Sequence, residues 1–418
     1  MDPELEPDEE GALEDASVAT SRTGRRLVAD VVGAFERDSN TKRTDARMTA
    51  RSTYIHLEVF DPLYPLTVDI LGGNLARPRG VVYMLPGGAS NFRSSFMTPP
   101  ADNLAHYFRR HGYLVVGISP REDAVPRDAP DLSFMKGWDM AQHRADVRAV
   151  VERVQGVVQL PYELLGHSYG AATALDYAGA YPGEAQRVFA LDIYSIDPVA
   201  DRGAMRNARY THQAYVDLMR DGVLADTSYA DFPELARQGL LRTRDGGAQR
   251  QYDYEGYTSK QMLLFGMIYS SYLPGVHTPL TGLPGDWPMA QSTVAGDEGW
   301  EFRPSDDERT FARTSMATLA LASQALGGGL VSMAFARDYW SVVAQSEGAH
   351  LLRWSSIVGP VVWVNSELGY AGQTHGADLI RAGGNTQVEV QVVEDYGHAD
   401  MLWSRTARED VWSRLLPP

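Results

Sequence analysis

The sequence predicts an α/β fold, in which a mostly parallel β-sheet carries helices on both faces and is interrupted by a large, mainly helical insertion. From residue 53 onward, short β-rich runs alternate with longer runs of helical spacing, and two of the short runs are apolar throughout. Strands that alternate with helices are typical of βαβ units in a parallel sheet. Strands that are apolar throughout are typical of a sheet covered on both faces.

Each predicted element follows from its local pattern. The strands are short β-rich runs, and the helices are longer runs in which apolar residues recur with helical spacing. The predicted strands are TYIHLEVF (53–60), LTVDIL (66–71), GVVYML (80–85), YLVVGI (113–118), YELLG (162–166), RVFALDI (187–193), PVVWVN (360–365) and VEVQVV (388–393). The predicted helices are ADNLAHYFRR (101–110), MAQHRADVRAVVERV (140–154), SYGAATALDYAGAYP (168–182), RTFARTSMATLALASQALG (309–327) and ADMLWSRTAREDVWSRLL (399–416).

These patterns divide the chain into four parts. Residues 1–25 are acidic and poor in apolar side chains, so we expect a disordered tail. Residues 26–198 form the first part of the α/β core. The alternation of strands and helices then stops, and residues 199–355 form the helical insertion. Residues 356–418 supply the second part of the core, with its last two strands.

Composition excludes several classes of function. The formal net charge of −16 argues against nucleic acid or an anionic membrane surface as a partner, because both would repel the chain. The absence of cysteine excludes disulfides, thiolate nucleophiles and cysteine-ligated metals. No apolar run is long enough to span a bilayer, and the N-terminus lacks the pattern of a signal peptide. We therefore expect a cytoplasmic protein.

The remaining polar residues indicate neither a metal nor a cofactor. The histidines are scattered, no H-E-x-x-H or other metal-binding spacing is present, and no dinucleotide-binding fingerprint follows a strand. We expect a small-molecule substrate and no cofactor. Only three of the 38 basic residues are lysines, a bias typical of a high-GC bacterial source.

The segment LLGHSYGAATAL (164–175) contains the first candidate for chemistry. Its Gly-x-Ser-x-Gly pentapeptide is weak evidence by itself, so the surrounding pattern has to decide. Here the motif closes an apolar strand and opens a helix of small residues, which is the strand-turn-helix context of a nucleophile elbow. Gly166 and Gly170 would relieve the crowding around a strained serine. We therefore interpret Ser168 as a nucleophile rather than a structural turn residue.

A serine hydroxyl needs a base to remove its proton. His398 lies in EDYGHADML, directly after the last predicted strand and before the last helix. That position gives the chain order serine, acid, histidine that is found on this architecture. We assign His398 as the general base. His167, next to the serine, we interpret as a packing residue behind the sheet.

Taken together, these features resemble the α/β-hydrolase superfamily over most of residues 50–200 and 355–418. The motifs that carry the resemblance are LPGGAS (85–90), GHSYGAAT (166–173) and YGHADM (396–401). The resemblance implies two backbone donors for an oxyanion, the N–H of Tyr169 and an N–H of the LPGGAS loop. Gly88 is the first candidate for the second donor and Ala89 the next, although Gly87 and Gly88 can also serve simply as a turn. The resemblance also places a substrate-covering lid at the insertion.

The acid of the triad has more than one candidate. Most members of the superfamily carry an aspartate shortly after the strand that we place at 360–365, and that position falls near Gly369. In the platelet-activating-factor acetylhydrolase-like branch, the acid instead follows an earlier strand in the sequence A-L-D, and the later strand ends in N-S-E. This chain is similar to that branch in ALD (190–192) and VNSE (364–367). Asp192 is therefore our first candidate, with Glu367 and Asp197 as alternatives.

The site residues predict a serine hydrolase that cleaves a carboxylic ester or lactone through an acyl-enzyme. The alternative is an acyltransferase, or a lyase or cyclase of a biosynthetic pathway, that uses the same residues, because fold alone does not decide the reaction. A catalytically inert binding protein is a third reading, against which the serine and histidine argue.

The insertion is rich in aromatic residues and methionine. These side chains either pack the insertion's own core or form an apolar lid that favours a bulky or aromatic substrate. The insertion can equally form a homodimer surface. The residues in question are Met262, Tyr269, Tyr272, Trp287, Met289, Trp300 and Tyr339.

Overall fold

The computed structural model describes residues 14–49, 52–73, 78–227, 294–295, 311–346 and 350–416. In these ranges the strands form a sheet of nine strands in the order β1-β2-β3-β5-β4-β6-β7-β10-β11. β1, β2, β3 and β5 pair antiparallel, and every pair from β5 to β11 is parallel. The predicted α/β fold with a mostly parallel sheet is confirmed.

Each of the predicted strands is present, close to its predicted bounds. The strands of the large sheet are β1 (Lys42–Met48), β2 (Ser52–Val59), β3 (Leu66–Gly73), β4 (Gly80–Leu85), β5 (Tyr113–Ser119), β6 (Tyr162–His167), β7 (Arg187–Leu191), β10 (Val361–Ser366) and β11 (Val388–Val393). β1 was not predicted. Its sequence KRTDARM is polar and mostly exposed, because it lies at the edge of the sheet and has no apolar face to bury.

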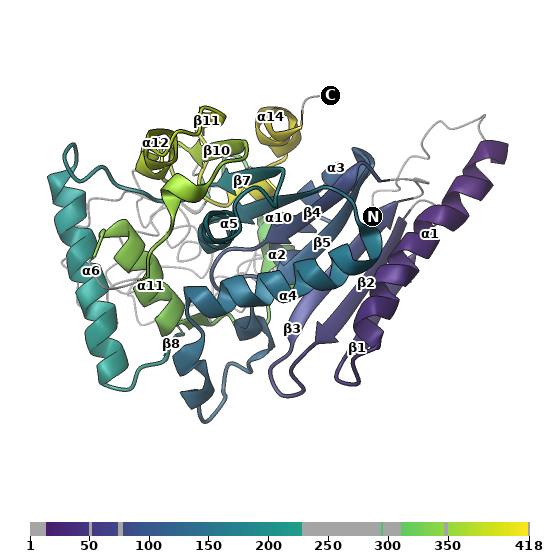
Figure 1. Ribbon diagram of the computed structural model, residues 1–418, viewed down its shortest axis with the longest axis horizontal. Coiled ribbons are helices and arrows are strands. Elements are labelled where there is room, and N and C mark those ends of the chain that lie inside the picture. Colours follow the sequence, from purple (N-terminus) through teal and green to yellow (C-terminus); the bar gives the residue numbers. More distant parts are fainter. Residues whose placement is uncertain are drawn as a thin grey trace, which may run out of the picture.

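The sheet is covered on both faces (Figure 1). β4 shows the reason: Val81, Tyr83 and Leu85 belong to one hydrophobic cluster, whereas Val82 and Met84 belong to the other. Successive side chains of a strand point to opposite faces, so a strand buried on both sides must be apolar throughout. The first cluster includes side chains of α1 (Glu14–Glu36), α4 (Met140–Val158), α5 (Tyr169–Ala180) and α12 (His375–Ala382). The second includes those of α2 (Phe92–Phe96), α3 (Leu104–Arg110) and α13 (Asp400–Trp403).

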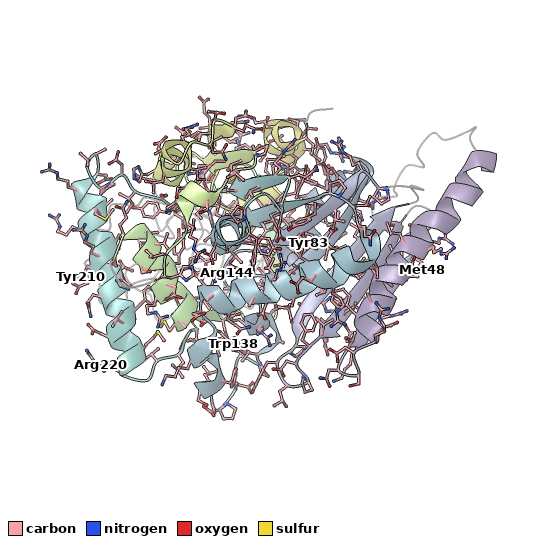
Figure 2. All side chains as sticks on the ribbon, viewed as in Figure 1. Met48, Tyr83, Trp138, Arg144, Tyr210 and Arg220 are labelled. Carbon is pink, nitrogen blue, oxygen red and sulfur yellow. The ribbon has the colours of Figure 1, made fainter. Side chains whose placement is uncertain are left out.

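The helices on the first face are tied to one another and to the sheet. Asp139 caps α4 by accepting a hydrogen bond from the backbone N–H of Gln142. Arg144 of α4, labelled in Figure 2, donates to the buried carboxylate of Asp176 in α5, with an N–O distance of 2.7 Å. α5, which follows Ser168, is therefore fixed against both the sheet and its neighbour helix.

Two predictions near the ends of the chain need correction. We expected a disordered tail over residues 1–25, but α1 already begins at Glu14. The packing of its apolar face on α4 and β3, from Val28 onward, stabilises this helix. Residues 1–13 lie outside the described residues. The single terminal helix predicted for 399–416 is divided into α13, a π-helical turn at Arg408–Trp412 and α14 (Ser413–Leu415). α12 was not predicted.

The insertion supplies three described helices and a short strand pair between β7 and β10. The helices are α6 (Arg202–Arg220), α10 (Met316–Gln324) and α11 (Met333–Val343), and the strands are β8 (Ala225–Asp226) and β9 (Val331–Ser332). α6 and α11 pack against each other beside the core (Figure 1). Tyr210 and Arg220 lie on α6 at the outer edge of the molecule (Figure 2). Of the aromatic and methionine residues named for the insertion, only Tyr339 lies within the described residues.

Candidate active site

Ser168 occupies a sharp turn between β6 and α5. Its backbone has φ 55° and ψ −124°, a conformation that a residue with a side chain rarely adopts. The two glycines of the motif make this turn sterically possible. A Cβ on Gly166 would lie 2.2 Å from the carbonyl oxygen of Gly170, and a Cβ on Gly170 would lie 2.0 Å from that of Leu85. The strained serine conformation is typical of a nucleophile elbow.

His398 and Asp192 come together although 206 positions separate them in the chain. His398 follows β11, and Asp192 follows β7. His398 Nδ1 and Asp192 Oδ2 are 2.6 Å apart, a short charge-assisted hydrogen bond. Asp192 is completely buried, whereas the His398 side chain is 13% exposed. The imidazole is therefore oriented by the carboxylate through Nδ1.

The Asp192 carboxylate is itself held from the end of β10 and the loop that follows it. Its Oδ1 accepts hydrogen bonds from the backbone N–H of Ser366, at 2.7 Å, and of Tyr370, at 3.3 Å. Its backbone has φ 45°, a second strained position beside that of Ser168. These bonds satisfy a buried carboxylate that would otherwise be costly to desolvate.

Gly369 lies near the position at which the family resemblance would place an aspartate, and the structure leaves no room for a side chain there. A Cβ at this position would lie 2.1 Å from Asp192 Oδ2 and 2.2 Å from the hydroxyl oxygen of Ser366. Real Cβ atoms do not approach other atoms so closely, so the Asp192 carboxylate fills the space that a side chain at 369 would need. The two positions are mutually exclusive sources of a carboxylate.

The other two candidate acids lie away from the imidazole. Glu367 is exposed, and its Oε2 accepts a hydrogen bond of 2.9 Å from the backbone N–H of Asp395. Asp197 Oδ1 accepts from the backbone N–H groups of Val199 and Ala200, which lower the pKa of its carboxyl group. Neither carboxylate is hydrogen-bonded to His398.

His167 lies inside the site rather than behind the sheet, which corrects the sequence interpretation. Its Nε2 is 2.9 Å from the carbonyl oxygen of His398, and the two rings are 4.4 Å apart between centroids. Burial, and next the nearby His398, lower the pKa of His167 well below its ordinary value. A neutral His167 can donate to that carbonyl, and the bond ties the elbow to the loop of His398. Apart from its place beside the serine, no sequence signal marked this role.

The LPGGAS loop borders the elbow. A Cβ on Gly87 would lie 3.1 Å from Ser168 Cβ, and a Cβ on Gly88 would lie 2.8 Å from the ring of Tyr169. Ala89, the alternative donor, has φ 56°. The loop must therefore remain free of side chains at 87 and 88 if its backbone is to approach the serine.

A pocket adjoins this loop. Gly87, Gly88 and Tyr169 line one end of it, and Leu330, Val331 and Phe335 of the insertion contribute apolar side chains. The Phe335 ring lies 5.0 Å from that of Tyr169, and Tyr339 packs against Tyr169 at 4.8 Å. The remote end contains Glu122 and His143. Sequence reasoning missed Phe335, Glu122 and His143, because nothing in their local patterns separates them from ordinary packing residues.

In the described ranges, no group of three or more His, Asp or Glu side chains is arranged to hold a metal ion. None of the described helices combines the length and the apolar character that crossing a membrane requires.

No protein-family model matches this sequence, and no curated protein matches it. Solved structures do match. A protein from Sulfolobus solfataricus that is described as a lipase superposes with a TM-score of 0.59 at 16% identity, over 90% of this chain and 97% of that one. A carboxyl esterase from Bacillus coagulans matches at 15% identity with a TM-score of 0.44, over 87% of this chain and 96% of its own. The similarity to the Sulfolobus protein, with the sheet described above, shows that the chain has the α/β-hydrolase fold.

Proposed function

We propose that the protein is a serine hydrolase that cleaves a carboxylic ester or lactone. The observation that carries the proposal is the 2.6 Å bond between His398 Nδ1 and Asp192 Oδ2, next to a strained serine turn. A buried carboxylate on Nδ1 leaves the other imidazole nitrogen to act as a base. The loop of His398 is bonded to the residue that precedes Ser168.

The reaction begins when Ser168 Oγ attacks the carbonyl carbon while His398 Nε2 takes its proton. Asp192 holds the tautomer and stabilises the imidazolium. The backbone N–H groups of Tyr169 and Gly88 stabilise the oxyanion. Collapse of the tetrahedral intermediate breaks the single bond between the former carbonyl carbon and the oxygen of the leaving alcohol, and that alcohol takes the proton from His398. Water, deprotonated by His398, then attacks the acyl-enzyme and releases the acid.

The pocket supports an apolar substrate. Leu330, Val331 and Phe335 line it together with Gly87, Gly88 and Tyr169, so a substrate that occupies the pocket lies against the insertion. We propose that the insertion acts as a lid that excludes water from this contact. The Sulfolobus neighbour, described as a lipase, is consistent with an ester of this kind.

The position of the acid supports a finer relationship. The chain places its candidate acid after β7 and carries VNSE at the end of β10, in common with the platelet-activating-factor acetylhydrolase-like branch. We propose that the chain is most closely allied with that branch. The incompatibility of a side chain at 369 with the Asp192 carboxylate supports this assignment.

The proposal is tested by intact mass after treatment with a fluorophosphonate, whose phosphorus captures an activated serine with loss of fluoride. We expect a single adduct on the wild type and none on Ser168→Ala. Ser195→Ala is a matched control, because Ser195 is a buried serine at the same edge of the sheet, and it should label like the wild type. Equal labelling of Ser168→Ala, or no labelling of the wild type by both a bulky and a small probe, would contradict the proposal.

A further inference from the structure

The remote end of the pocket holds a carboxylate oxygen without a partner. Glu122 lies in the 3-10 turn Arg121–Ala124 that follows β5, is only 3% exposed and lines the pocket. Its Oε1 pairs with His143 Nε2 at 3.0 Å. Its Oε2 is buried and has no hydrogen-bond partner among the described residues. Buried polar atoms are nearly always hydrogen-bonded, so an orphaned carboxylate oxygen on a residue that lines a pocket indicates a missing donor.

The basic side chains near Glu122 are already paired with carboxylates. Arg121 Nε and Nη2 bind both oxygens of Asp146 at 2.7 and 2.8 Å. Burial alone would lower the pKa of His143, but the facing Glu122 carboxylate and then Asp146 outweigh it, and the pKa of His143 is raised. The Arg121 guanidinium also lies 3.6 Å from the carboxylate of Asp61. The nearby basic side chains thus already have carboxylate partners, and Oε2 needs only one more hydrogen-bond donor, which a neutral hydroxyl supplies.

The orphaned oxygen and the candidate oxyanion hole belong to one pocket. Phe335 of α11 connects them, since its ring lies 5.0 Å from the Tyr169 ring and 4.5 Å from the His143 ring. A substrate arm that starts at the carbonyl between Gly88 and Tyr169 would pass along Phe335 and end at Glu122. Such an arm is apolar along its length and polar at its tip.

We infer that Glu122 Oε2 accepts a hydrogen bond from a hydroxyl at the end of the substrate arm in this pocket, so that the preferred substrates are hydroxylated esters or lactones. This inference rests on the proposed function and names its substrate class. The hydroxyl would give a partner to the one Glu122 oxygen that has none among the described residues. An ester that lacks the hydroxyl leaves a buried acceptor unpaired, which is the basis of strong discrimination.

The test uses p-nitrophenyl esters of straight-chain acids of graded length. Each is paired with the ester whose chain ends in a hydroxyl and with the one that ends in an ammonium group. For each length, the ratio of kcat/KM for the hydroxy ester to kcat/KM for the unsubstituted ester is measured. At the length that reaches Glu122, we expect the wild type to favour the hydroxy ester on the order of tenfold or more. Glu122→Leu, whose side chain neither accepts nor donates, should lose most of that ratio.

Glu163→Leu is the matched control. Glu163 is also a buried glutamate with an unpartnered Oε2. It lies near the start of β6, at the end of that strand away from the elbow, and it does not line the pocket. Its variant should keep the wild-type ratio, and thermal melting checks that both variants fold.

Each outcome decides the inference. A wild type without a preference for the hydroxy ester at any length overturns it, whether or not Glu122→Leu folds, and so does a preference for the ammonium ester. Equal ratios in the wild type and Glu122→Leu also overturn it. If esters are cleaved and Ser168 is labelled, these results overturn the inference about Glu122 but leave the proposed function intact. No turnover together with no labelling overturns the proposed function, and the inference with it.

Discussion

The loops that follow β7 and β10 lie side by side at the same edge of the sheet, yet one contributes a carboxylate to the site and the other contributes backbone N–H groups. The loop after β7 carries Asp192, which is completely buried and bonded to His398. The loop after β10 carries Gly369, where no side chain fits, and the exposed Glu367. The second loop contributes backbone N–H groups to the carboxylate of the first. In this chain the carboxylate comes from the end of β7, and the end of β10 is shaped to receive it.

The largest effect that the comparison predicts belongs to Asp192. Asp192→Asn should lower kcat by about 10³- to 10⁴-fold, because the amide stabilises the wrong imidazole tautomer and no longer offsets the imidazolium. Steady-state kinetics on a p-nitrophenyl ester measure this. Near wild-type turnover in Asp192→Asn would show that the acid lies elsewhere.

Gly369→Ala should have the next largest effect. The added methyl would overlap Asp192 Oδ2, at 2.1 Å, so the carboxylate must move away from His398. We expect kcat to fall by about 10- to 100-fold, since misplacing a catalytic group by about 1 Å costs that much. Gly372→Ala, in the same loop, is the control, because a Cβ there meets no atom within 4 Å. If both variants kept full activity, the conclusion that a side chain at 369 and the Asp192 carboxylate exclude each other would be wrong.

The acid limb of the pH profile of kcat/KM sharpens the assignment of the base. Burial and the neighbouring His398 keep the pKa of His167 well below its ordinary value, so His167 stays neutral where a histidine base loses its proton. The slope of the acid limb should therefore correspond to the loss of a single proton, in the wild type and in His167→Gln alike. A slope that corresponds to two protons in the wild type and to one in His167→Gln would mean that His167 titrates together with the base.

The smallest expected effect is that of Glu367→Gln. Its carboxylate is exposed and bonded to the backbone N–H of Asp395. Turnover should stay within about twofold of wild type and the free energy of unfolding within about 0.5 kcal/mol, as is usual for a surface substitution. Kinetics and urea unfolding measure the two quantities. A large loss of turnover with normal stability would restore Glu367 as a candidate acid.

The sequence predicted those parts of the fold whose burial leaves a local pattern. β4 and β5 are apolar throughout because both of their faces are covered. The elbow was predictable because Gly166 and Gly170 are required by contacts within one strand-turn-helix unit. β1 was missed because an exposed edge strand has no apolar face.

Residues that act through contacts far apart in the chain were harder to predict. Asp192 was identified through a family resemblance, and no local pattern distinguishes it from Asp197. The Glu122–His143 pair joins a turn and a helix 21 positions apart, and each residue alone looks like an ordinary charged side chain. His167 was misassigned because its partner, the backbone of His398, lies 231 positions away.

The most direct test of the account is the proton on His398 Nδ1, observed by NMR in protein labelled with ¹⁵N-histidine. A histidine Nδ1–H bonded to a buried carboxylate resonates far downfield, and His398→Gln identifies which signal belongs to it. His56, whose Nδ1 lies 2.7 Å from Asp69, provides an internal reference. The account predicts that Asp192→Asn removes the His398 signal, whereas Glu367→Gln keeps it. A signal that survives in Asp192→Asn and is lost in Glu367→Gln would contradict it.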